Sequence, residues 1–337
     1  MTISSLRGRN SVHSFCTLFD SNYLSRGLAM YRSLRRECSS FTLYIFAFDD
    51  RCLHLLRQLN LPNVVVISLE EFEDHELLAI KETRTRVEYC WTCTSSTILY
   101  VLERFGVNQC TYLDADLFFL GSPDSLFDEM GGNSILITEH RYTPMYDKSN
   151  VSGKYCVQFI SFRNDERGLT TLRWWRSRCL EWCYARVEAG KFGDQMYLDD
   201  WTTRFEGVHV LQHLGGGVAA WNVQQYSLKA NDGKITGKEI STGRDFELIF
   251  YHFHYVRFFT DGRVDLGRRI LSEQVRALLY KPYLEELESI KRELAAVNNS
   301  FDPHGSQRWS RSWKTPLLYA WRRLRGTYHV YQNHKLT

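Results

Sequence analysis

Segments typical of buried strands alternate with segments typical of helices through the first third of the chain, and this alternation is the strongest restriction on its fold. Strands that alternate with helices build βαβ units, whose strands lie mostly parallel. Ligands of such sheets bind beyond the carboxyl ends of the strands. We expect strands at 13–19, 41–48, 64–67 and in the segment ending at 113, and helices at 23–34, 52–59 and 87–105, with a capped turn opening at 68.

The rest of the chain mixes the two patterns. We expect strands at 155–162 and 246–254, and helices at 169–187, 194–204 and 272–297, the last interrupted near Pro282. Together the segments predict an α/β protein with a Rossmann-like mixed sheet flanked by helices. This sheet would belong to a single main domain at 10–265, and residues 266–337 would form a helical extension that is basic and aromatic.

The composition excludes several classes of protein. With 337 residues, 44% of them hydrophobic and 24% charged, the chain is typical of a globular protein with a large core. The net charge of +3 is too small to indicate a nucleic-acid partner. The first residues are polar and no apolar run approaches the roughly 20 residues of a membrane span, so we expect a cytoplasmic protein without a signal peptide. The nine cysteines are an odd number, and we expect mostly reduced thiols.

Two aspartates stand one residue apart where an apolar strand ends. Asp114 and Asp116 follow Tyr112-Leu113 and lead into a glycine-containing turn. Carboxylates this close raise each other's pKa unless a cation lies between them. A hard divalent ion with oxygen ligands, Mg²⁺ or Mn²⁺ carrying a diphosphate, would satisfy both. The alternative is a strand end followed by a solvated turn.

Asp20, Asn22 and Tyr23 form a second polar group at a strand-to-helix turn. A carboxylate, an amide and a ring can bind the edge and face of a nucleobase, and the alternative is an ordinary helix N-cap. The first strand is not followed by G-x-G-x-x-G, which argues against a dinucleotide site, and the chain lacks a P-loop motif.

Two histidines close the aromatic segment 246–254. His252 could give nitrogen to the same metal, since imidazole suits Mn²⁺ better than Mg²⁺, and the alternative is a hydrogen-bonded structural histidine. His254 would share its face, and Arg257 just beyond could bind a phosphate oxygen.

Two further groups have weaker signals. Gly193-Asp194-Gln195 opens a helix, where Asp194 is either a helix cap or a carboxylate of the site. Arg84 and Arg86 precede the helix that leads to the aspartates, and could bind phosphate or, as the simpler expectation, pair with Glu82 and Glu88 at the surface.

Cysteine pairs and a basic tail complete the candidates. Cys90/Cys93 and Cys179/Cys183 have spacings seen in metal and redox sites, but both pairs lie in expected helices without completing ligands. From 305 to 337 the chain has no Asp or Glu and mixes tryptophan with arginine, for example in Trp321-Arg322-Arg323. Such a stretch suits an anionic membrane surface, or equally a helix packed on the body.

The motifs occur in the order found in nucleotide-sugar glycosyltransferases of the GT-A fold. Over residues 13–260 the chain most resembles the retaining family that includes glycogenin and the bacterial lipooligosaccharide α-galactosyltransferases. The matching motifs are the base-binding start at 19–23, the D-x-D motif at 112–116, the D-Q element at 193–195, the W-N pair at 221–222 and the H-F histidine at 252–253.

The resemblance implies a role for each matching residue. Asp20, Asn22 and Tyr23 would lie near the nucleobase, and Asp194 and Gln195 beside the donor sugar. The metal ligands, for Mn²⁺ or Mg²⁺, would be Asp114, Asp116 and His252, and Asp114 would also reach the ribose.

The chain departs from the family at three places. His254 and Tyr255 replace a small residue and a glycine, and the family's lysine-proline-tryptophan is absent, so that Arg257 would replace the lysine at the phosphates. The family's arginine in the helix before D-x-D falls at about Thr97, so Arg84 or Arg86 would stand in for it.

The sequence therefore predicts metal-dependent transfer of a sugar, with retention of configuration implied by the resemblance. The donor would be a nucleotide diphosphate sugar, UDP-linked by preference, and the acceptor a hydroxyl of a glycan or glycolipid. Two alternatives stay open. One is a metal-dependent phosphohydrolase with an aspartate nucleophile, although that class favours a threonine or valine where Phe118 stands. The other is a degenerate homologue that only binds nucleotide or glycan.

Overall fold

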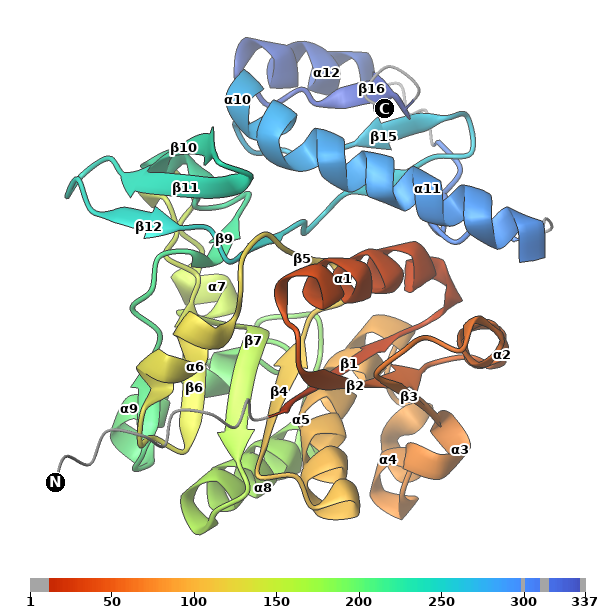
Figure 1. The fold of residues 1–337 in the computed structure, drawn as a ribbon, viewed down its shortest axis with the longest axis vertical. Helices are drawn as coiled ribbons and strands as arrows, with labels where there is room; N and C mark the ends of the chain where they lie inside the picture. Colours follow the sequence, from red (N-terminus) through yellow and green to blue (C-terminus); the bar gives the residue numbers. More distant parts are fainter. Residues whose placement is uncertain (1–11, 298–300, 310–314, 334–337) are drawn as a thin grey trace, which may run out of the picture.

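A seven-stranded mixed sheet forms the centre of the computed structural model, which describes residues 12–297, 301–309 and 315–333 (Figure 1). Its strand order is β3-β2-β1-β4-β7-β6-β8. The first four strands in this order are parallel, and β7 is antiparallel to both of its neighbours. The strands are β1 (His13–Phe19), β2 (Phe41–Ala47), β3 (Val64–Ser68), β4 (Gln109–Leu113), β6 (Ile135–Glu139), β7 (Tyr155–Arg163) and β8 (Val208–Val210).

Helices cover both faces of this sheet. In β1, Phe15 and Phe19 pack into the core beneath α1, while Cys16 and Leu18 pack into the core that includes α5 and α8. Because both faces are buried, the strands read as continuous apolar runs, which is why the α/β class could be predicted. The helices up to residue 204 are α1 (Leu24–Glu37), α2 (Asp50–Leu59), α3 (Leu69–Phe72), α4 (His75–Lys81), α5 (Arg86–Phe105), α6 (Asp124–Met130), α7 (Ser149–Ser152), α8 (Glu166–Glu181) and α9 (Trp201–Arg204).

Local capping decides where several helices begin. The predicted capping box at Ser68 is confirmed, and Thr85 forms a second one at the start of α5. The expected helix at 169–187 is wrong at both ends. Helix α8 begins earlier because the Asp165 side chain caps it by accepting from the Gly168 N–H, and it ends earlier because Trp182 has an extended backbone.

A smaller sheet, β5-β13-β9, continues from the carboxyl end of β4. It consists of β5 (Leu117–Phe119), β9 (Gly216–Ala219) and β13 (Phe250–His252), with β13 antiparallel to β5 and parallel to β9. The single strand expected at 246–254 is wrong. It divides because its first part, β12 (Asp245–Glu247), pairs instead with β11 (Lys234–Glu239), which also pairs with β10 (Tyr226–Asn231).

The C-terminal region includes strands as well as helices. Strand β15 (Arg263–Asp265) pairs with β14 (Arg257–Phe258) and with β16 (Val330–Gln332), so the expected boundary after residue 265 follows a strand that joins the two regions. The expected helix at 272–297 is present, but it is continuous: α10 (Glu273–Val275) runs through a π-helical turn, Arg276–Tyr280, into α11 (Lys281–Val297). Pro282 has no N–H to donate, which accounts for the irregular turn before it. The last helix is α12 (Thr315–Leu324).

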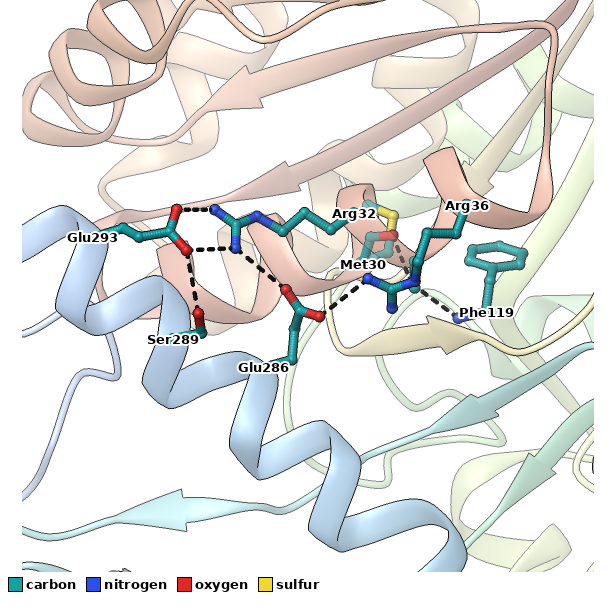
Figure 2. A network of polar contacts seen from close by, with 8 residues as sticks. Met30, Arg32, Arg36, Phe119, Glu286, Ser289 and Glu293 are labelled. Carbon is teal, nitrogen blue, oxygen red and sulfur yellow. Dashed lines mark hydrogen bonds and ion pairs between the residues drawn. The ribbon is translucent and has the colours of Figure 1, made fainter. Parts of the chain in front are cut away.

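Helix α11 lies across α1, and ion pairs fasten the two (Figure 2). Arg32 contacts Glu293 at 2.5 Å and Glu286 at 3.3 Å, and Arg36 contacts Glu286 at 3.0 Å. On the inner side of α1, the Ser33 hydroxyl accepts a hydrogen bond from the Phe119 N–H at 3.0 Å. Helix α1 therefore ties the extension to strand β5.

A buried ion pair fixes α12 to the end of β15. Arg322 of α12 is 2% exposed and makes two contacts with the Asp265 carboxylate, at 2.8 and 3.0 Å. The same guanidinium donates to the Gly267 carbonyl at 2.6 Å and to the Thr327 carbonyl at 3.1 Å.

Among the residues that the structure describes, we find no helix with the length and apolar character of a membrane span.

Removing Arg322 should destabilise the protein strongly, because the Asp265 charge would stay buried without a partner. We expect Arg322→Met to lower the free energy of unfolding by about 3–5 kcal/mol, measured by urea denaturation. Arg325→Met, which removes an exposed arginine stacked on Trp321, is the control and should change the free energy by about 0.5 kcal/mol or less. Equal effects of the two substitutions would contradict this interpretation.

Candidate active site

A cavity of about 660 Å³ opens where β4 and β13 end. Asp114, Asp194 and His252 line it, as does His254. This is the edge of the sheet that the strand pattern predicted, and the D-x-D aspartate, the D-Q element and the H-F histidine meet there.

The backbone of the Asp114–Asp116 turn is held from two sides. The Asp114 N–H donates to the Gln158 carbonyl of β7 at 3.0 Å, and the Phe253 N–H donates to the Asp116 carbonyl at 3.0 Å. The turn is thus fixed between the large sheet and the small one. Asp116 is 7% exposed, so the solvated-turn alternative does not describe it.

His252 bridges the aspartates and a buried glutamine. Its Nε2 lies 3.0 Å from Asp116 Oδ1 and 3.6 Å from Asp114 Oδ2. Its Nδ1 lies 2.7 Å from Gln158 Oε1, an acceptor, so Nδ1 carries a proton and Nε2 faces the carboxylates. His252 is therefore hydrogen-bonded through Nδ1, as the structural alternative expects, while its Nε2 is the nitrogen that the metal-ligand hypothesis requires.

The charges of this group are strongly coupled. Burial alone would raise the pKa of Asp116, but the cationic His252 beside it lowers that pKa to about 2. Burial raises the pKa of Asp114 to about 6, against the opposing charge of His252. Burial would lower the pKa of His252, and the Asp116 carboxylate raises it well above its usual range. Without a bound metal, the protonated His252 ring is thus the cation that faces the two carboxylates.

His254 extends the group beyond what the sequence assigned. One ligand atom each from Asp116, His252 and His254 lie within 4.8 Å of one another. His254 follows the end of β13 in a turn, and Trp221 packs edge-on against both imidazoles, with ring centroids 5.3 Å from His252 and 5.8 Å from His254. Its spacing of two residues from His252 was the available signal.

The Trp221-Asn222 pair has a structural role. The Trp221 Nε1 and the Asn222 amide both donate to the His140 carbonyl at 2.8 Å. The Asn222 Oδ1 also accepts from the Ala219 N–H at 2.9 Å. These bonds fix the tryptophan that supports the two histidines.

Asp194 and Gln195 also line the cavity. Gly193 precedes them at φ +53°, and a Cβ there would lie 3.3 Å from the Trp91 ring, so a glycine is required. The Trp175 Nε1 donates to the Asp194 carbonyl at 2.8 Å, and the Gln195 amide donates to the Ser152 carbonyl at 2.6 Å.

The helix expected at 194–204 is wrong at its start. A 3-10 turn, Met196–Asp200, precedes α9, and Gln195 occupies the cap position without a side-chain capping bond, so Asp194 is not the cap. Burial, and then the charge of Asp114, raise the pKa of Asp194 to about 7.

The expected base-binding residues lie beside this cavity and outside its lining. Asp20 Oδ1 accepts from the Asn22 N–H at 2.8 Å, which is the N-cap considered from the sequence. Loss of solvent around the phenol, and then the charge of Asp116, raise the pKa of Tyr23 to about 12. The charges of Asp114 and Asp20 act on the Tyr23 phenol in the same direction.

The expected surface pairing of Arg86 with glutamate is wrong. Arg86 contacts Asp20 at 2.6 Å and Asp49 at 2.8 Å. Glu88 is instead engaged by the Thr85 capping box and by the Ala185 N–H. Arg84 also lacks the expected partner and stacks on the Tyr184 ring, with its carbon 4.0 Å from the centroid.

Two arginines of the cavity wall were missed from the sequence. Arg268 and Arg269 line the cavity, on the loop that Arg322 holds through Gly267. Arg257 lies outside the lining, stacked 4.1 Å over the ring of Tyr255, which does line it.

The cysteines contribute no metal ligands. All nine are free, and in the described part of the chain none joins a group of ligands close enough for one ion. Cys90 and Cys93 lie in α5 and Cys179 in α8, whereas Cys183 follows the end of α8.

Comparison with known proteins places the chain in a family. No family model matches it. It is 30% identical over 300 residues to the uncharacterized protein YfnD of Bacillus subtilis strain 168, an alignment that covers 86% of this chain and 93% of YfnD. The chain belongs to the family of YfnD. It is also 28% identical over 305 residues to YfnF of the same organism, covering 87% of this chain and 98% of YfnF.

Among solved structures, the fold is similar to that of the galactosyltransferase LgtC in complex with donor and acceptor sugar analogues. The TM-score is 0.52 at 12% identity, with 82% of this chain and 95% of LgtC covered. An active-site mutant of LgtC gives a TM-score of 0.51 at 11% identity. The GT-A fold predicted for this YfnD relative is therefore confirmed, with its mixed sheet and flanking helices.

The raised pKa of Asp194 predicts a pH-dependent stability. Between about pH 4 and pH 7 the folded protein keeps a proton that the unfolded chain has released, so stability falls as the pH rises through this window. Asp194→Asn should remove this pH dependence, which amounts to up to about 4 kcal/mol in the free energy of unfolding. In urea denaturation the variant should be more stable than wild type at pH 8 and similar at pH 4. A parallel pH dependence of the two proteins would contradict it.

Proposed function

We propose that this protein transfers a sugar from a nucleotide diphosphate sugar to a hydroxyl acceptor. The observation that carries the proposal is the group of two carboxylates and an imidazole at the carboxyl edge of a GT-A sheet. The donor and acceptor sugar analogues in the LgtC complex support this reading of the cavity. A UDP-linked donor, a glycan or glycolipid acceptor and retention of configuration are proposed from the resemblance.

The residues fit a divalent metal. The cationic His252 ring between Asp114 and Asp116 marks a place where positive charge is stabilised. We assign Asp114, Asp116 and His252 as ligands of Mn²⁺ or Mg²⁺, which when bound would neutralise the leaving diphosphate. Gln158 orients His252 through Nδ1 and leaves Nε2 to face the ligand oxygens.

Different residues around the metal would bind different parts of the donor. Asp20, Asn22 and Tyr23 would hold the nucleobase, with Arg86 fixing Asp20 through its 2.6 Å contact. Asp194 and Gln195 would orient the donor sugar at the reacting carbon. Because burial, and then the charge of Asp114, raise its pKa, Asp194 would hold its proton until positive charge develops beside it.

Cations of the cavity wall would bind the phosphates. Arg257 remains our proposal from the resemblance, and it stacks on Tyr255, which lines the cavity. Arg268 and Arg269 are added because they line the cavity directly. Guanidinium groups bind phosphate oxygens in pairs of hydrogen bonds.

The phosphohydrolase alternative gains no support from the position of the motif. That class places its aspartates near the start of the chain, whereas here they follow β4, between the large sheet and the small one. The degenerate-homologue alternative predicts binding without turnover, and assays with Mn²⁺ distinguish it.

Asp116→Asn should reduce metal-dependent transfer to about one-hundredth of wild type or less, because an anionic ligand of the metal that would neutralise the leaving diphosphate is lost. The measurement is release of nucleoside diphosphate and transfer to acceptor across a panel of nucleotide sugars with Mn²⁺. Asp128→Asn, at an exposed position of α6 that does not line the cavity, is the control and should keep its activity. Full activity of Asp116→Asn would refute the proposed function.

We also propose that α12 contacts an anionic membrane. Leu317, Trp321 and Leu324 recur at helical spacing on α12 and are 68%, 48% and 88% exposed. Arg325 stacks 4.2 Å over Trp321, so that positive charge adjoins the apolar stripe. The basic residues Arg311 and Lys314 lie outside the described residues, and a cytoplasmic location remains a prediction.

The double variant Leu317→Glu/Leu324→Glu should bind vesicles of phosphatidylcholine and phosphatidylserine at least about tenfold more weakly than wild type, because two exposed apolar contacts are replaced by negative charge. Sedimentation with the vesicles measures this. Leu78→Glu alters an exposed leucine (53%) on α4 and should bind as wild type does. Wild-type binding that is equally strong to pure phosphatidylcholine would contradict the proposal.

A further inference from the structure

The ring of His254 has no hydrogen-bonding partner within the described residues, although it lies in a wall crowded with polar groups. Its neighbours are the rings of His252, at a centroid distance of 5.7 Å, of Trp221 and of Tyr255. The residue is exposed to the cavity while Asp116 and His252 beneath it are buried. An imidazole nitrogen in this position faces the same point as Asp116 and His252 and is not engaged elsewhere.

Three ligand atoms already converge without any rearrangement of the backbone. One atom each from Asp116, His252 and His254 fall within 4.8 Å of one another, so that small side-chain rotations would bring all three to about 2 Å from a common ion. Trp221 packs against both imidazoles and its Nε1 is fixed by the His140 carbonyl, so the two rings share one rigid support.

The support behind His252 is equally specific. Gln158 Oε1 holds Nδ1 of His252 at 2.7 Å. Gln158 itself packs on Gly217, where φ is +117° and an added Cβ would lie 3.1 Å from the glutamine Nε2. The glutamine side chain therefore lies against both the histidine and strand β9.

We propose that His254 is a second imidazole ligand, which joins Asp114, Asp116 and His252 in binding the metal of this site. This inference rests on the proposed function and concerns which ion the enzyme uses. Two nitrogen ligands favour a transition-metal dication such as Mn²⁺ over Mg²⁺, which prefers an all-oxygen shell. The site discriminates between the two ions by ligand type.

The test is metal binding by the whole protein without nucleotide. Titration calorimetry gives the dissociation constants of Mn²⁺ and Mg²⁺, and the electron spin-echo modulation of bound Mn²⁺ gives the number of directly bound ¹⁴N nuclei. We expect wild type to show two bound nitrogens and to prefer Mn²⁺. His254→Ala should show one nitrogen and bind Mn²⁺ about 10–100-fold more weakly, with a much smaller change for Mg²⁺.

Two further variants make the result specific. His254→Asn substitutes an amide oxygen for the nitrogen and should lower the preference for Mn²⁺ over Mg²⁺ while keeping an ordered side chain at the position. His54→Ala removes an exposed histidine of α2 and should change neither constant nor the nitrogen count. Circular dichroism of each variant checks that it is folded, and His254→Asn serves if His254→Ala is not.

The outcomes separate this inference from the proposed function. Unchanged Mn²⁺ affinity and two bound nitrogens in folded His254→Ala or His254→Asn would overturn the assignment of His254, while sugar transfer by the same protein would leave the proposed function standing. A count of two bound nitrogens in wild type and one in His254→Ala would support His254 as a ligand. If the wild-type protein at the same time transferred no sugar, the proposed function would be refuted.

Discussion

The contact between Asp116 and His252 is the interaction on which the rest of the site depends. Two carboxylates at the end of β4 are close enough to repel, and the 3.0 Å contact with the His252 ring offsets this repulsion in a buried position. The contact requires β13 to lie beside β5, and the ring orientation requires Gln158 on β7. Elements from three distant parts of the chain are thus fixed relative to one another by one charged group.

The C-terminal region belongs to this arrangement and does not merely follow the main domain. Arg322 holds Asp265 and Gly267, and His329 Nε2 lies 3.0 Å from the Arg269 carbonyl, so the wall that carries Arg268 and Arg269 is positioned from α12 and the segment after it. Since α12 also carries the exposed apolar stripe, a surface that binds α12 would contact the element that supports the cavity wall.

Local patterns were sufficient to predict the central sheet. The strands from His13 and Phe41 are buried on both faces and read as unbroken apolar runs, and the capping box at Ser68 is complete within four residues of sequence. The meeting of Asp114 and His252 is different: Asp114 follows β4 of the large sheet, whereas His252 ends β13 of the small sheet, which is antiparallel to β5. The chemistry of imidazole and the resemblance, rather than the strand pattern, suggested that the two residues lie at one metal.

The errors arose where a distant partner decides the outcome. The segment 246–254 is apolar throughout, and only its pairing with β11 and then with β5 divides it into two strands. Arg86 has glutamates nearby in sequence, yet Asp20 and Asp49 lie closer in space. Arg269 has no local signal, because its place in the cavity wall depends on Arg322 and His329.

The central claim is that this edge of the sheet binds a nucleotide diphosphate sugar together with a divalent metal. The most direct measurement is the melting temperature of the wild-type protein with UDP-, GDP-, CMP- and dTDP-sugars, each with and without Mn²⁺. We predict that one nucleotide sugar raises the melting temperature in the presence of Mn²⁺, and that chelation of the metal abolishes the increase. No increase with any donor, or an identical increase after chelation, would contradict the account.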